Sequence, residues 1–124
     1  MKALICTFLT LCFAHIALAA APLKVEITVS DQIRYSSKKI EAKKGVPLQI
    51  TVKHTGKIPK ASMAHNFVVL KPGSSIPMVA AKCHQAKDDE YIADDADTKA
   101  SIVVHSKLLG PGESHTIQLD RKST

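Results

Sequence analysis

Apolar and polar residues alternate in two stretches of the chain with the period of a β-strand. In the stretch 24–29 every second residue is valine or isoleucine, with lysine, glutamate and threonine between them. The stretch 48–54 alternates in the same way and places His54 on its apolar face. A period of two is typical of a strand with one buried and one solvated face. We therefore predict strands at 24–29 and 48–54, with His54 turned inward.

Four further strands and one helical segment are predicted from shorter patterns. Apolar runs bounded by glycine and proline turns predict strands at 38–42, 65–70, 102–104 and 115–119. The segment 76–98 is rich in alanine, aspartate and lysine and carries a small apolar set, which favours a short helical flap. Short strands at regular spacing, with no internal repeat and no βαβ rhythm, indicate an all-β antiparallel sandwich.

Two kinds of chemistry are not supported by the residue patterns. The acidic stretch 88–97 lacks the glycine and the closing glutamate that a calcium loop needs, so we interpret it as a solvated loop. Histidines lie near Ser101, Ser106 and Ser114 in the sequence. No nucleophile turn, glycine-rich oxyanion loop or orienting acid accompanies these serines. The sequence therefore predicts a protein that is not an enzyme.

The first residues have the pattern of a secretory signal. Lys2 is followed by an uncharged apolar run that ends in the small residues of 17–19, which predicts a signal peptide over 1–19 and a domain over 20–124. A retained membrane anchor is disfavoured because the run barely reaches the ~20 apolar residues of a spanning helix. We expect a periplasmic or otherwise exported protein with no membrane anchor after cleavage. Cys83 is then the one cysteine left, either buried and inert, paired with another molecule, or a metal ligand.

The charge balance is basic, with 17 lysines and arginines against 11 acidic residues and a formal net charge of +6. Nucleic-acid binding is disfavoured because the basic residues are interspersed with acidic and apolar ones and aromatic residues make up only 4% of the chain. We interpret the charge as a solvated surface that steers an acidic partner protein.

Three stretches of the chain match motifs of one known family in the same order. Residues 63–67, Met-Ala-His-Asn-Phe, resemble a Met-Gly-His-Asn copper-ligand motif that is followed by an aromatic residue. Residues 54–60, His-Thr-Gly-Lys-Ile-Pro-Lys, resemble a His-Pro-Gly-x-Leu-Pro-Lys loop, and residues 105–113 are similar to a His-Thr-Lys-Leu-Ile-Gly-x-Gly-Glu stretch. On these motifs the chain resembles the azurins, in the plastocyanin/azurin family of blue (type 1) copper proteins, the cupredoxins. The resemblance implies a Greek-key β-sandwich.

The resemblance also implies roles for four residues. His65 takes the place of the first copper histidine, and Ala64 stands where the family has a glycine whose backbone carbonyl is a weak axial contact. Asn66 corresponds to the asparagine that ties the ligand loops together around the metal. His54 corresponds to a histidine near copper that is not a ligand. Cys83 and His84 form a poor substitute pair, because adjacent residues on a helix point about 100° apart.

The other ligands of the family come from a Cys-x-Phe-Pro-Gly-His and Met-Lys-Gly segment, which does not follow Asp120. We therefore expect a truncated chain that lacks the last two of eight strands and leaves core side chains such as Phe67 uncovered. The complete protein is expected to carry one type 1 copper and to shuttle one electron between periplasmic partners such as cytochromes or copper enzymes. The alternative is a truncated or degenerate cupredoxin that holds no type 1 copper and acts as a binding or interaction domain.

Overall fold

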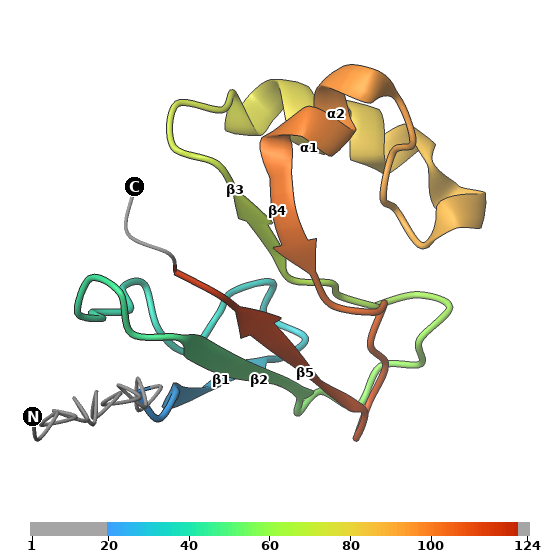
Figure 1. The fold of residues 1–124 in the computed structure, drawn as a ribbon. Coiled ribbons are helices and arrows are strands. Elements are labelled where there is room, and N and C mark those ends of the chain that lie inside the picture. Colours follow the sequence, from blue (N-terminus) through green and yellow to red (C-terminus); the bar gives the residue numbers. More distant parts are fainter. Residues whose placement is uncertain (1–19, 122–124) are drawn as a thin grey trace, which may run out of the picture.

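The computed structural model describes residues 20–121 as a set of short strands with a helical segment between them (Figure 1). The strands are β1 (Leu23–Val29), β2 (Leu48–His54), β3 (Val68–Leu70), β4 (Ile102–His105) and β5 (Ser114–Leu119), and the helices are α1 (Ile76–Gln85), the 3-10 turn η1 (Lys87–Asp89) and α2 (Ala96–Ser101). The predicted signal peptide over 1–19 lies outside the described residues. Within residues 20–121, every helix is too short or too polar to cross a bilayer.

Two sheets make up the body of the domain. One has the strand order β1-β2-β5, and the other pairs β3 with β4. Figure 1 shows α1 and α2 lying together on the side of the β3–β4 sheet that is away from the larger sheet. This arrangement confirms the predicted β-sandwich with a helical flap. The predicted strands outside 38–42 and 65–70 match the observed ones within a residue at each end.

One strand pairing corrects the prediction of a purely antiparallel sheet. β1 and β2 run parallel, with Val25 opposite Ile50, whereas β2 and β5 run antiparallel. Parallel neighbours need a long crossover connection, on the order of a dozen residues or more. The segment 30–47 supplies it by running back along the sheet from the end of β1 to the start of β2 (Figure 1).

The predicted strand at 38–42 does not form. These residues are irregular, although Ile40 and Ala42 do pack against the core. The alternation of apolar and polar residues here therefore means that one side of the segment packs against the core, although no strand forms. Within the described chain, this connection pairs with β1 around the Val29–Tyr35 bridge and again where the Leu23 amide donates to the Pro47 carbonyl. Neither pairing includes 38–42, so no neighbouring strand satisfies the backbone of these residues.

The predicted strand at 65–70 is shorter than expected, and Ser106 explains why. The amide of Phe67 donates to the Ser106 hydroxyl over 2.9 Å, and the amide of Ser106 donates to the Phe67 carbonyl over 2.8 Å. A side chain thus takes the place of a ladder partner, and regular pairing begins only at Val68. The effect is to set His65 and Asn66 in a loop ahead of β3.

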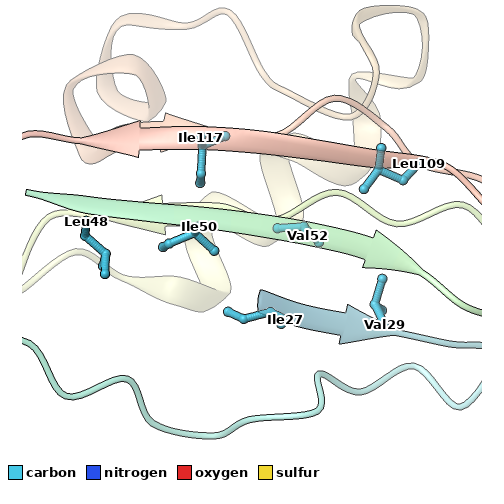
Figure 2. Packing of buried hydrophobic residues seen from close by; sticks show 7 residues of the cluster. All are labelled: Ile27, Val29, Leu48, Ile50, Val52, Leu109 and Ile117. Atoms are coloured by element: carbon cyan, nitrogen blue, oxygen red, sulfur yellow. The ribbon is translucent and has the colours of Figure 1, made fainter. Parts of the chain in front are cut away.

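The core is a single apolar cluster on the inner face of the larger sheet (Figure 2). It consists of Ile27, Val29, Leu48, Ile50, Val52, Leu109 and Ile117. Phe67 is half-buried against this cluster, and it also lines a cavity of about 570 Å³ that lies between the sheets and includes Ile40 and Leu119 in its wall. The side chain is therefore neither fully enclosed nor fully uncovered.

The helical flap is held together by an ion pair whose strength depends on pH. Lys82 of α1 donates to Asp95 over 2.6 Å, and Asp95 also caps α2 by accepting from the amide of Thr98 over 3.2 Å. The hydrogen bond from Lys82, followed by that from Thr98, holds the pKa of Asp95 well below its usual 3.8. A carboxyl with a depressed pKa in the folded state stabilises that state above its unfolded pKa, and this contribution is lost as the pH falls.

We expect Asp95→Asn to lower the melting temperature at neutral pH, because asparagine keeps the cap but loses the ion pair. The difference from the parent chain should shrink as the pH falls from about 3.8, where Asp95 of the unfolded chain becomes protonated, toward the lower pKa of the folded state. Thermal unfolding followed by circular dichroism between pH 2 and 7 measures this, with Asp88→Asn as a control on the exposed turn η1. A difference that stays constant across this range would rule out the ion pair as its cause.

Candidate metal centre

His65 is held by its backbone just ahead of β3. Its amide donates to the Leu109 carbonyl over 3.0 Å, and the Leu109 amide donates back over 2.7 Å. The ring atom Nε2 is buried and has no hydrogen-bond partner within residues 20–121. A buried polar atom without a partner costs about 1–3 kcal/mol, so this histidine is suited to take a ligand from outside the described residues.

The surroundings of His65 keep its ring uncharged. Burial lowers the pKa of His65 below its usual 6.5, and the electrostatic effect of the neighbouring His54 lowers it further. The Ser30 carbonyl and the Asp31 carboxylate act in the opposite direction with smaller effect. The neutral imidazole that results near pH 7 is the form that binds metal ions.

His54 lies beside His65 at the end of β2 and is completely buried. The two rings are stacked, with centroids 5.1 Å apart and planes 26° apart. Nδ1 of His54 accepts from the amide of Gly56 over 3.1 Å, which requires the proton to be on Nε2, and Nε2 in turn donates to the Met63 carbonyl over 3.0 Å. Both nitrogens are thus used by the backbone, so His54 supports the ligand loop and has no free nitrogen for a metal.

The loop that follows β2 is held in place by hydrogen bonds to the side chain of Asp31. The Asp31 carboxylate accepts from the amide of Lys57 over 2.8 Å. Gly56 has no room for a side chain here, because a Cβ would lie 2.7 Å from Cε1 of His54 and closer still to the Asp31 carboxylate. Glycine at this position thus allows the loop to close over His54.

Asn66 joins the histidine loop to the helical flap. Its Nδ2 donates to the Glu90 carbonyl over 3.0 Å, and its own backbone carbonyl accepts from the Tyr35 hydroxyl over 3.0 Å. Ala64 and Asn66 both line a cavity of about 490 Å³. The structure therefore places Asn66 against the turn after η1, whereas the resemblance implied a contact with a second ligand loop.

Comparison with known proteins identifies the family. Residues 21–124 match the model of the family described as copper binding proteins, plastocyanin/azurin family. The chain belongs to this family. Its fold is also that of reduced auracyanin from Roseiflexus castenholzii, with a TM-score of 0.63 and 23% identity over 84% of this chain and 79% of that one. The predicted family and the predicted cupredoxin fold are both confirmed.

Relatives within and around this family are longer than the present chain. The azurin of Bordetella pertussis is 32% identical over 102 residues, which cover 82% of this chain and 66% of that protein. Outer membrane protein H.8 of Neisseria gonorrhoeae is 37% identical over 92 residues, or 73% of this chain and 48% of that protein. The azurin of Pseudomonas fluorescens biotype C is 30% identical over 101 residues, which cover 81% of this chain and 77% of that protein. The chain thus spans slightly less than two-thirds of the first of these relatives and about half of the second.

The described residues of this cupredoxin do not by themselves fit type 1 copper. Such a site needs two histidine nitrogens and one cysteine sulfur in a plane around the metal. Within residues 20–121, no group of three or more histidine, cysteine or acidic side chains is placed to hold a metal ion. Cys83 lies on α1 and lines a different cavity, together with His84 and Tyr91. The residues in place supply one candidate ligand, the buried Nε2 of His65, and the residues that support it.

Sequence reasoning missed three members of this shell. Asp31, Tyr35 and Glu90 each contact the histidine loops from positions 24–31 residues away in the chain. In two of these contacts the acceptor is a backbone carbonyl, which every residue type has, so the sequence does not indicate which residue accepts. Asp31 had a weak signal, since an aspartate in the turn after a strand is typical of a residue that binds nearby amides.

Proposed function

We propose that this cupredoxin domain is the His65-bearing part of a blue copper protein that carries single electrons. The further copper ligands are then supplied by polypeptide outside residues 20–121. The observation that carries the proposal is the buried Nε2 of His65, which has no partner in the described chain. Membership of the copper-binding plastocyanin/azurin family supports it.

Copper in such a site supplies a one-electron couple, and the protein supplies a fixed geometry that suits both oxidation states. Here the paired backbone of His65 and Leu109 fixes one ligand, and the stacked ring of His54 prevents it from turning. Burial keeps the His65 ring neutral and ready to bind. Each of these contributions is positional, so the domain is proposed as an electron carrier and not as an enzyme.

The location and partners of the carrier are proposed on the same basis. The signal pattern over 1–19 supports export to the periplasm, where soluble cytochromes or copper enzymes are the expected electron partners. The net charge of +6 supports partners with an acidic docking surface. A signal-cleaved protein recovered from the periplasmic fraction would support this location, and retention in the cytoplasm would contradict it.

The first test is to read the gene beyond the codon for Thr124 and to express whatever the reading frame encodes. With Cu(II) the product should show the intense blue absorption and the narrow copper hyperfine splitting of a type 1 site. His65→Ala should abolish both and weaken copper binding by more than the ~10–100-fold that loss of a supporting residue costs. His105→Ala, an exposed histidine on β4, is the matched control. Blue absorption that survives in His65→Ala would refute the assignment.

A second candidate function is favoured by the lack of a three-ligand cluster in the described residues. In that case the domain holds no type 1 copper and serves as a binding or interaction domain. Calorimetric titration of the 124-residue chain with Cu(II), together with the sequence beyond Thr124, separates the two. A frame that closes without a Cys-x-x-Pro-Gly-His pattern and a chain that takes up no copper would favour this candidate.

A further inference from the structure

The connection between β1 and β2 carries a run of positive charge that the proposed copper site does not use. Its segment 34–44 contains five basic residues and one acidic residue, a net charge of 5 − 1 = +4. The acidic residue, Glu41, is paired with Lys39 at 2.6 Å. The others are Arg34, Lys38, Lys43 and Lys44, and all of them are exposed. We call these five basic residues the basic strip.

The packing of this connection turns the strip outward. Ile40 and Ala42 pack against the core, and the residues that alternate with them, Glu41 and Lys43, are exposed. Arg121 lies beside the C-terminal part of this segment, where its guanidinium donates to the Lys43 carbonyl over 3.3 Å. In Figure 1 the connection runs along the larger sheet from one end of its strands to the other. The strip therefore lines one side of the domain.

Charge is segregated on this molecule. Six of its 11 acidic residues lie in the segment 88–97, which belongs to the helical flap. Three of them pair with lysines of the flap itself, Asp95 and Asp97 with Lys82 and Asp94 with Lys99. The basic strip has no such local neutralisation beyond Glu41 within the described residues. A strip of one sign on a domain with the opposite sign elsewhere has a preferred orientation toward a charged surface.

An exposed isoleucine stands at the start of the strip. Ile33 is 73% exposed and has a φ of 54°, a backbone conformation that β-branched residues rarely adopt. The turn is closed by the Ile33 amide, which donates to the Ser30 carbonyl over 3.2 Å. Strain of this kind persists where the surrounding structure enforces it, and it points to a use for the exposed side chain. The use favoured here is contact with an apolar phase beside the basic residues.

The shape of the strip favours a flat partner. None of its five residues lines the cavities of about 490, 390 and 570 Å³ described for this domain. Protein partners are anchored by a few large side chains in pockets, whereas a layer of anionic headgroups is recognised by spread lysines and a shallow apolar contact. We propose that the basic strip, with Ile33 at its end, binds the surface of a bilayer that contains anionic phospholipids. This inference goes beyond the proposed copper function and does not depend on it.

The test is co-sedimentation of the full chain with vesicles of phosphatidylcholine alone, and with vesicles of phosphatidylcholine and phosphatidylglycerol in equal parts. The parent chain should bind the anionic vesicles much more tightly, and about 1 M salt should weaken this binding because it screens charges beyond ~3 Å. The triple variant Lys38→Gln, Lys43→Gln, Lys44→Gln should bind the anionic vesicles about 100-fold more weakly, since each basic residue near such a surface contributes roughly a fivefold gain. Ile33→Ser should weaken binding further in high salt.

The matched control is Lys53→Gln, Lys87→Gln, Lys107→Gln, which removes the same charge from exposed positions elsewhere. Control binding equal to that of the parent, with circular dichroism unchanged in both triple variants, supports the strip. Equal weakening of both triples would overturn it in favour of net charge alone. If the strip variant binds as tightly as the parent, the assignment to the strip is overturned, and the apolar residues 3–20 become the binding element. Equally tight, strip-dependent binding to heparin would overturn the lipid assignment in favour of any polyanion.

Discussion

Replacing Ile50 by alanine is expected to lower the free energy of unfolding by about 2–5 kcal/mol. Ile50 is 2% exposed and lies on β2, the central strand of the larger sheet. It stands opposite Ile117 on β5 and Val25 on β1, and Figure 2 shows it within the apolar cluster. Truncation removes packing on both sides, and the two flanking strands prevent the sheet from collapsing into the space.

Urea unfolding followed by circular dichroism measures the loss. Ile76→Ala is the matched control, because it makes the same chemical change at a position that is 70% exposed, and it should stay within about 0.5 kcal/mol of the parent. Total stabilities of small domains are about 5–15 kcal/mol, so the Ile50 variant is expected to lose a large part of the whole. Equal, small losses in both variants would show that β2 is not at the centre of the core.

The strands that could be predicted from sequence are those with one face against the core. In β2 and β5, and in β1 from Lys24 onward, the more buried positions alternate with more exposed ones, and this alternation is what the sequence pattern records. The pattern at 38–42 was equally regular and still misleading, because Ile40 and Ala42 are buried without a neighbouring strand. The parallel pairing of β1 and β2 was missed because side-chain alternation carries no information on strand direction.

At the candidate metal centre, motifs located the residues but not their contacts. The motif matches drew attention to His54, His65 and Asn66, and the structure brings the two histidines into a stacked pair. The partner of the Asn66 side chain was not predictable, since it is the backbone carbonyl of Glu90, a residue in the left-handed region. Contacts of this kind depend on where the chain returns in space, which residue types alone do not specify.

His54→Ala is expected to destabilise the domain by about 2–4 kcal/mol, because it leaves a cavity and two buried backbone groups without partners. Those groups are the Gly56 amide and the Met63 carbonyl. His105→Ala, on the surface of β4, should change the free energy of unfolding by no more than about 0.5 kcal/mol. Comparable losses in the two variants would mean that the His54 hydrogen bonds contribute nothing specific.

Two conservative variants apportion this loss between the ring nitrogens. In His54→Asn the side-chain oxygen can take the place of Nδ1 and accept from Gly56, whereas in His54→Gln the side-chain nitrogen can take the place of Nε2 and donate to Met63. Each should recover part of the stability. Amide hydrogen exchange at His65, whose amide donates to Leu109, then reports on the ligand loop. If the Met63 contact is what holds that loop, His54→Gln should protect the His65 amide better than His54→Asn does. The reverse order would mean that the Gly56 contact holds the loop.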